Sequence, residues 1–404
     1  MGSETTTTRG RRPALAVLAL LGVTLTGCQA APSHPSMPSG HGGAASHAEA
    51  PAAKPGAGKE AVLDLRGAPD IPGIVEQLAG YDAVFVGESH TRYDHHRNQL
   101  AVIRGLYERN PDLAIGAEFF QRRFQPALDD YIAGRLDEAG MLEKTGYFDR
   151  WRYDYRLYRP ILRFARDKGI PVIALNLANR KVRAVARHGR DGLDAAQREG
   201  LPAIRVEPDA AYRARLRKTF ERHPQQGGRT FENFVQAQLL WDEGMAERVA
   251  GHLADHPGRR MVVLAGNGHV VYGQGIPERV EARGDYDTAV VVNGVESSYG
   301  PGVADFLVLS EEETLPKPGR LGVFLGQEDG AVIADGFDEG SPARKAGMEE
   351  GDRFVAIAGR PIESMADIRI AMLGRAPGEK VTVRVERDPL FGGPTEHEYE
   401  VELH

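Results

Sequence analysis

The chain has 404 residues, of which 41% are hydrophobic and 26% are charged, and its formal net charge is −7. This balance is that of an ordinary globular protein with enough apolar residues for a sizeable core. The acidic excess argues against nucleic acid as a partner, and the single cysteine excludes a disulfide within the chain.

Residues 1–27 have the layout of a bacterial export signal. Three arginines between residues 9 and 12 precede an apolar segment, residues 14–26, which is too short for an ordinary bilayer span. The segment leads to Cys28, and together they resemble a bacterial lipobox. That resemblance implies cleavage before Cys28 and attachment of acyl chains such as palmitate, so we expect an exported lipoprotein anchored in a membrane. Gln29 favours the outer membrane, with the protein facing the periplasm or the cell surface. An uncleaved anchor or an ordinary signal peptide is the alternative.

The rest of the chain divides by composition into a tether and two domains. Residues 28–60 are rich in Ala, Pro, Gly and Ser and lack apolar periodicity, which is typical of a flexible tether. Residues 61–312 form the first predicted domain. A proline-containing acidic linker follows, and residues 320–404 form a second, smaller domain.

Short apolar runs in the first domain have the length and continuity of central strands covered on both faces. We predict strands at residues 82–87, 113–118, 171–176 and 261–265, with two more at 289–292 and 306–309. Apolar residues at helical spacing predict helices between them, among them residues 94–109 and 231–253. This alternation predicts an α/β domain with a mostly parallel sheet flanked by helices.

Polar side chains follow the predicted strands at the ends where open parallel sheets bind their ligands. They are Glu88 and His90 after the first strand, Glu118 at the second, Asn176 at the third, and Asn267, His269 and Tyr272 after the fourth. We expect them to share one rim, where they could ligate a metal or haem iron or act as general acids and bases. The alternative is that the carboxylates cap helices and the histidines satisfy buried polar groups.

Three further features have two interpretations each. Gln238 and Asp242 lie four residues apart on a predicted helix and share a face, so they either reach the pocket or pair at the surface. The aromatic segment 147–158 either walls a ligand pocket or, as is commoner, belongs to the core. His95 and His96 are adjacent on a predicted helix, and we expect both at the surface.

Five segments of the first domain are similar to the ChaN family, haem-binding and iron-regulated lipoproteins of the Tiki-like superfamily. They are VGESH at 86–90, GAEF at 116–119, IPVIALN at 170–176, QLLWD at 238–242 and AGNGHVVYGQGIP at 265–277. The resemblance covers about residues 61–310. It implies an α/β fold, a haem pocket, a tyrosine ligand to the iron and haems stacked in a homodimer interface.

The resemblance and the strand ends together define the residues expected at the ligand site. They are Glu88, His90, Glu118, Asn176, Gln238, Asp242, Asn267, His269 and Tyr272. Tyr272 is the expected ligand of the haem iron, and His269 is the second candidate.

The main hypothesis is therefore a haem-binding surface lipoprotein for iron and haem acquisition, a role that requires no enzymatic activity. Relatives in the superfamily use Gly-Glu-x-His and a later His for peptidase or esterase chemistry. The alternative is accordingly a hydrolase that uses a divalent metal with Glu88, His90, Glu118 and His269. A third interpretation is a scaffold that has lost any ligand.

The second domain resembles a bacterial PDZ domain. Its segments LGVF at 321–324, GSPARKAGM at 340–348, GDRF at 351–354 and the predicted helix 365–373 match the family pattern. The resemblance implies that Leu321, Gly322, Val323 and Phe324 form a carboxylate-binding loop. A peptide or protein C-terminus would then bind as an added strand. In some bacterial proteins such domains hold a neighbouring domain instead.

Overall fold

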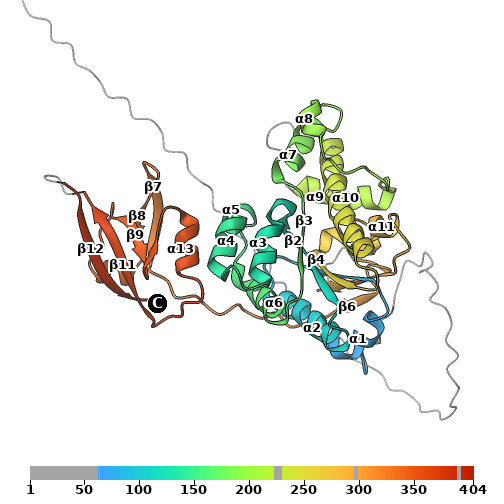
Figure 1. Cartoon of the computed structure of the whole chain (residues 1–404), viewed down its shortest axis with the longest axis horizontal. Coiled ribbons are helices and arrows are strands. Elements are labelled where there is room, and N and C mark those ends of the chain that lie inside the picture. Colours follow the sequence, from blue (N-terminus) through green and yellow to red (C-terminus); the bar gives the residue numbers. More distant parts are fainter. Residues whose placement is uncertain (1–61, 63, 223–229, 295–298, 389–392) are drawn as a thin grey trace, which may run out of the picture. The chain divides into compact units, whose positions relative to one another are not determined.

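The computed structural model describes residue 62 and residues 64–222, 230–294, 299–388 and 393–404. The expected export signal, Cys28 and the tether lie outside these ranges. Two separate six-stranded sheets organise the described chain (Figure 1). None of the helices in these ranges is both long enough and apolar enough to cross a membrane.

The first sheet is entirely parallel, with the strand order β3-β2-β4-β1-β5-β6. Its strands are β1 (Ala83–Glu88), β2 (Leu113–Gln121), β3 (Val172–Asn176), β4 (Arg260–Gly266), β5 (Thr288–Asn293) and β6 (Phe306–Val308). Each predicted strand overlaps an observed one, and the largest difference is at β2, which continues beyond Glu118. The predicted parallel α/β sheet is confirmed.

Helices cover both faces of this sheet. The α-helices of the domain are α1 (Ile71–Leu78), α2 (Tyr93–Arg109), α3 (Gln125–Ile132), α4 (Glu138–Thr145), α5 (Tyr147–Arg150), α6 (Tyr155–Lys168), α7 (Asn179–His188), α8 (Ala195–Arg198), α9 (Ala210–Arg222), α10 (Phe231–Asp255) and α11 (Ile276–Glu281). One face packs against α1, α2 and α6, and the other packs against α10 and α11.

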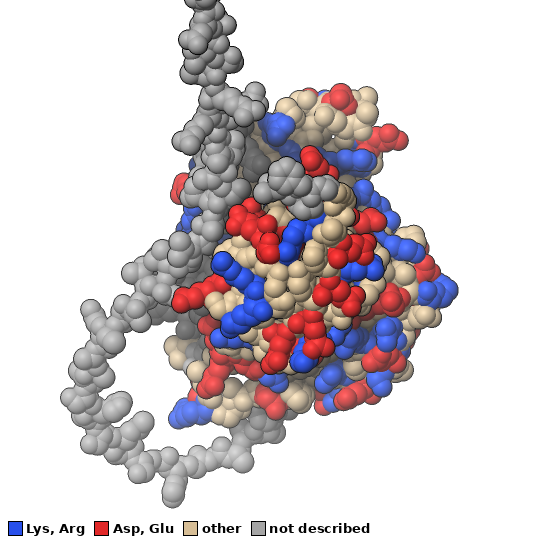
Figure 2. All heavy atoms as spheres, turned by 90° about the vertical axis from the view of Figure 1, so that its left-hand side faces the viewer, with Lys and Arg blue, Asp and Glu red and all other residues tan. Residues whose placement is uncertain are grey.

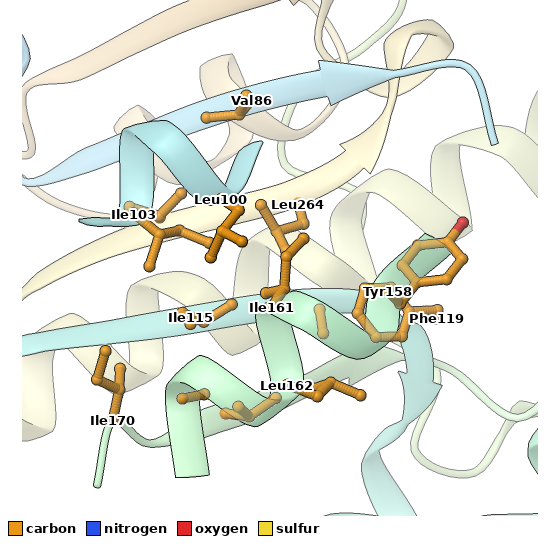
Figure 3. Close-up of a cluster of buried hydrophobic side chains, with 14 of the residues drawn as sticks. Val86, Leu100, Ile103, Ile115, Phe119, Tyr158, Ile161, Leu162, Ile170 and Leu264 are labelled. Atoms are coloured by element: carbon orange, nitrogen blue, oxygen red, sulfur yellow. The ribbon is translucent and has the colours of Figure 1, made fainter. Parts of the chain in front are cut away.

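Successive side chains of a strand point to opposite faces of the sheet, and because both faces are covered, the strand sequences are continuously apolar. In β1, Val84 and Val86 face the layer of α2 and α6, whereas Ala83 and Phe85 face the layer of α10. Figure 3 shows the first of these cores, in which Leu100 and Ile103 of α2 and residues of α6 pack on the sheet. Both faces of the strands are therefore removed from water, and the polar side chains gather at the strand ends.

The second sheet is antiparallel, with the order β12-β11-β9-β8-β7 and a short β10 beside β9. Its elements are β7 (Val323–Glu328), β8 (Ala331–Phe337), α12 (Pro342–Lys345), β9 (Arg353–Ile357), β10 (Arg360–Pro361), α13 (Met365–Ala371), β11 (Lys380–Arg387) and β12 (Thr395–Glu402). It encloses its own apolar core. The predicted PDZ architecture is confirmed.

On the face of the molecule drawn in Figure 2, basic and acidic side chains are interspersed.

Candidate functional site

Carboxylates and imidazoles from several elements meet at the carboxyl edge of the first sheet. Glu88 is the last residue of β1, Glu118 lies in β2, and His269 lies in a 3₁₀ turn directly after β4. His90 follows β1, and Asp242 comes from α10, which covers this part of the sheet. We call these five residues the polar cluster. Apart from His90, which is half-buried, they are buried.

Two carboxylates hold the ring of His269 from opposite nitrogens. Its Nδ1 lies 2.5 Å from Oδ1 of Asp242, and its Nε2 lies 3.5 Å from Oε1 of Glu118. Tyr212 of α9 donates a hydrogen bond to Oδ2 of Asp242. Burial alone would lower the pKa of His269, but the charges of Glu118 and Asp242 raise it to about 9. His269 is therefore an imidazolium at neutral pH.

A second imidazole–carboxylate pair lies beside the first. Nδ1 of His90 lies 2.5 Å from Oε1 of Glu88, and its ring packs against Trp151 and Tyr153 at centroid distances of 4.9 and 4.6 Å. Burial lowers the pKa of His90, while the hydrogen bond to Glu88 and the charge of Glu118 outweigh burial and raise it. The pKa values of both histidines are therefore raised above the ordinary imidazole value.

The pairs Glu118–His269 and Glu88–His90 approach each other at Gly266. Its backbone N–H donates to Oε2 of Glu118 at 2.8 Å. A Cβ at this position would lie 3.0 Å from Cε1 of His90 and 3.8 Å from Oε2 of Glu118. A side chain at this position would therefore crowd the His90 ring, whereas Glu118 would remain at an ordinary contact distance.

Amide and indole side chains contact the polar cluster and hold its residues in place. Asn176, the last residue of β3, accepts a hydrogen bond from Nε1 of Trp241 at 2.5 Å and donates to the backbone oxygen of Glu118 at 2.9 Å. The Trp241 ring lies edge-on to His269, with 5.4 Å between ring centroids. Nε2 of Gln238 lies 3.2 Å from Nδ1 of His269. Gln238 and Asp242 thus both face His269, as their helical spacing allows.

The prediction that His95 and His96 lie at the surface is wrong. Both are 2% exposed, because the first turn of α2 packs against the end of β1 and covers both directions in which adjacent helical residues point. Nδ1 of His95 accepts a hydrogen bond from the Ser89 N–H at 3.0 Å. Nε2 of His96 lies 3.9 Å from Oε2 of Glu88, so His96 extends the polar cluster inward.

Asn267 and Tyr272 do not join the polar cluster, so the single rim expected from the sequence is divided. The Asn267 side chain donates to the backbone oxygen of Asn293 at 3.1 Å and thus faces the end of β5. Tyr272 adopts a left-handed backbone conformation, with φ of 65°, which turns the chain after His269. Its backbone N–H bonds to the oxygen of Val303 at 2.7 Å.

Tyr272 instead lines a separate cavity of about 280 Å³, which we call the Tyr272 cavity. Its wall combines cationic, aromatic and amide side chains, among them Arg215, Lys218, Arg222, Phe234, Gln238 and Tyr299. The Tyr272 hydroxyl accepts a hydrogen bond from the Gly300 N–H at 2.9 Å, and the Arg215 guanidinium lies 5.1 Å from the centre of the Tyr272 ring. Because Gln238 also contacts His269, the cavity and the polar cluster adjoin at this residue.

Two residues of α9 that lie at the site were not predicted from the sequence. Tyr212 supports Asp242, and Arg215 lies between the rings of Tyr212 and Tyr272. No strand end adjoins them in the sequence, and only the packing of α9 on α10 brings them to the site. The one available signal was the clustering of aromatic and basic residues in YRARLRK at 212–218.

The aromatic segment 147–158 has both of the predicted roles. Tyr147, Tyr155 and Tyr158 are buried in the core, whereas Trp151 and Tyr153 are half-buried and cover His90.

Within the described ranges, no group of three or more His, Cys, Asp and Glu side chains is arranged to hold a metal ion.

The expected carboxylate-binding loop of the second domain leads into an outer strand. Leu321 is buried in the core, Gly322 has φ of +71°, and Val323 and Phe324 begin β7. Phe324 is 58% exposed. In the second sheet β7 pairs only with β8, which leaves its other edge unpaired by a strand of the described chain. An edge of this kind suits an added peptide strand.

Comparison with known proteins gives matches over both domains. Residues 74–280 match the family described as haem-binding uptake, Tiki superfamily, ChaN, and residues 335–387 match a PDZ domain. A solved structure described as cofacial haem binding to ChaN of Campylobacter jejuni is 14% identical, with a TM-score of 0.47, and the match covers 58% of this chain and 89% of that one.

Relatives at the sequence level share only part of their length with this chain. RETICULATA-RELATED 5, a chloroplastic protein of Arabidopsis thaliana, is 26% identical over 230 residues, which are 52% of this chain and 30% of the plant protein. A putative zinc metalloprotease of Brucella suis is 48% identical over 63 residues, which are 15% of this chain and 16% of that protein. Because the first family match spans half of the sequence, this chain belongs to the ChaN family of haem-binding uptake proteins in the Tiki superfamily, and it carries a PDZ domain as well.

Proposed function

We propose that this protein binds ferric haem in the Tyr272 cavity and serves haem or iron acquisition at a membrane. The observation that carries the proposal is the joint presence of Tyr272, Arg215, Lys218 and Arg222 around one cavity. Ferric iron favours an anionic oxygen ligand, and the two carboxylates of haem favour cationic partners. The haem-binding description of the family supports the same ligand.

The residues of the cavity fit this ligand. Tyr272 would hold the iron as a phenolate, and two groups that stabilise negative charge already lie beside it, the Gly300 N–H donor and the Arg215 guanidinium. The left-handed conformation of Tyr272 costs about 1–3 kcal/mol, and such conformations cluster at ligand sites. Bound haem would supply the iron that is carried, while the chain binds and orients it. The cavity volume of about 280 Å³ lies just below the usual range of ligand pockets, roughly 300–1,000 Å³, which supports completion of the site by a second subunit in a homodimer.

Titration with haemin tests the proposal. The wild type should bind haemin and show the charge-transfer absorption of tyrosinate-ligated ferric haem. Tyr272→Phe should retain the fold, because it removes one hydroxyl, but lose that band. Tyr286→Phe is the matched control, since Tyr286 is also half-buried and donates to the backbone oxygen of Ala250, away from the cavity. A spectrum unchanged by Tyr272→Phe would move the iron ligand to another residue.

Two further parts of the proposal concern location and partners. We infer that lipid on Cys28 anchors the protein in a membrane, with the outer membrane favoured by Gln29. The PDZ domain would then dock a peptide or protein C-terminus along the outer edge of β7. The unpaired β7 edge and the exposed Phe324 support this role.

Hydrolysis is the second candidate function, and the polar cluster is the observation that favours it. Two imidazole–carboxylate pairs, Glu88–His90 and Asp242–His269, lie on either side of Glu118. The raised pKa of His269, about 9, suits a general acid, which donates a proton to a leaving group. In the metal-dependent version, a divalent cation would have to displace these protons from the imidazoles.

A further inference from the structure

A second cavity of the first domain has five arginines among the ten residues that line it. It has a volume of about 590 Å³ and lies between α5, the turn after it and α7. Its arginines, which we call the arginine face, are Arg150, Arg152, Arg180, Arg183 and Arg187. Asp149 is the one acidic residue in its lining. None of these residues belongs to the polar cluster or to the Tyr272 cavity.

The five arginines have no anionic partner within the part of the chain that the structure describes. No ion pair or side-chain hydrogen bond of these residues occurs there, although Asp149 is nearby. Other arginines of the same domain do have partners: Arg163 lies 2.9 Å from Glu138, and Arg213 lies 2.5 Å from Glu232. The arginine face therefore carries a positive charge that the described chain does not neutralise.

The spacing of α7 concentrates this charge. Arg180, Arg183 and Arg187 recur at intervals of three and four residues, so they share one face of the helix, where like charges repel. Burial lowers the pKa of Arg150, and the nearby charge of Arg123 lowers it further. A bound anion would relieve the repulsion between these guanidinium groups.

Two backbone features adjoin the same cavity. The N-terminus of α7 begins at the cavity residue Asn179, and its N-cap, Ala178, makes no side-chain hydrogen bond to the free N–H groups of the first turn. Such N–H groups bind anions well. Arg152 has φ of 72°, a strained conformation for a residue with a side chain. This turn carries the Arg152 side chain to the cavity on the side of α5.

We propose that the arginine face binds a ligand bearing phosphate groups, and that this site is separate from the proposed haem site. One guanidinium group can donate two parallel hydrogen bonds to the oxygens of a phosphate. Several guanidinium groups around one cavity therefore suit a ligand with more than one negative charge. Free oligophosphates and the headgroups of anionic lipids share this chemistry. The proposal is independent of haem binding, because no residue of the arginine face lines the Tyr272 cavity.

Binding of inorganic pyrophosphate to the full chain tests the soluble form of the ligand. The test variant is Arg180→Gln/Arg183→Gln/Arg187→Gln, which keeps residues of good helix propensity. The control variant is Arg109→Gln/Arg135→Gln/Arg166→Gln, which removes the same charge from arginines that pair with surface acids. By calorimetry at low salt, the test variant should bind pyrophosphate about tenfold or more weakly, and the control should bind like the wild type.

Vesicles test the membrane source of the phosphate. The readout is the ratio of binding to phosphatidylglycerol-containing and purely phosphatidylcholine vesicles, in which any contribution of a lipid anchor cancels. A ratio that falls only in the test variant identifies lipid headgroups as the ligand, whereas an effect on pyrophosphate alone identifies a soluble phosphate. Equal losses in both variants, or no loss in either assay, would overturn the proposal. Haemin binding should be the same in all three proteins, which separates this result from the haem site.

Discussion

Asp242 and His269 form a short imidazole–carboxylate contact between distant parts of the first domain, with 2.5 Å between Oδ1 and Nδ1. The aspartate comes from α10 and the histidine from the turn after β4, so the contact links a covering helix to the edge of the sheet. Tyr212 holds the other carboxylate oxygen. Protonation of His269 is therefore coupled to the packing of α9 and α10 on the sheet.

Asp242→Asn should change how stability depends on pH. The pKa of His269 is raised to about 9 in the folded state, above its ordinary value of 6.5. The stabilisation that protonated His269 contributes is therefore fully present below pH 6.5 and is lost as the pH rises through 9. This loss lowers the free energy of unfolding by roughly 3 kcal/mol. Asp242→Asn should reduce this decrease, as measured by urea unfolding between pH 6 and pH 10. Asp112→Asn is the control, because Asp112 forms a surface ion pair with Arg259, and it should leave the pH dependence of the unfolding free energy unchanged. The same pH dependence in the wild type and both variants would contradict the coupling between Asp242 and His269.

Arg215→Gln should weaken haemin binding without unfolding the domain. The guanidinium lies 5.1 Å from the centre of the Tyr272 ring, where it stabilises negative charge on the phenolate that would hold ferric iron. We expect an affinity loss of about tenfold and a shifted charge-transfer band. Arg213→Gln is the control, because Arg213 lies on the same helix but pairs with Glu232. Haemin affinity that is equally reduced in both variants would indicate a general effect of charge.

The strands could be predicted because a parallel sheet covered on both faces requires continuous apolar runs, and β1, β2 and β4 have them. Their shared edge follows from the same rule, which is why Glu88, Glu118 and His269 could be grouped in advance. The position of Tyr272 could not, because one left-handed residue redirects the chain after β4. Nor could the burial of His96, since helical spacing does not show that the first turn of α2 is covered on two sides.

Cys28→Ala tests the proposed anchor. If Cys28 is the lipidated residue, metabolic labelling with a fatty acid should mark the wild type and not the variant. The variant should also move from the membrane fraction to the soluble fraction, or remain uncleaved at the export signal. Ser36→Ala, a change of similar size in the tether, is the control. Equal labelling of wild type and Cys28→Ala would show that the lipobox interpretation is wrong.

Glu118→Gln separates the two candidate functions. Glu118 lies between the imidazole pairs, and its charge raises the pKa of both His90 and His269. Glutamine keeps an oxygen that can accept from the Gly266 N–H but removes the charge. The pKa values of both histidines should fall, which NMR titration of the ring protons can follow.

Haem binding at the Tyr272 cavity predicts that Glu118→Gln leaves haemin affinity and the charge-transfer band unchanged, because Glu118 does not line that cavity. Hydrolysis at the polar cluster predicts the opposite pattern. The wild type would then cleave an ester or peptide substrate, with or without added Mn²⁺ or Co²⁺, and Glu118→Gln would reduce kcat by about 100-fold or more with a shifted pH profile. Tyr272→Phe would leave that activity intact. A loss of haemin binding in Glu118→Gln as large as that in Tyr272→Phe would place the haem against the polar cluster and contradict the proposed site.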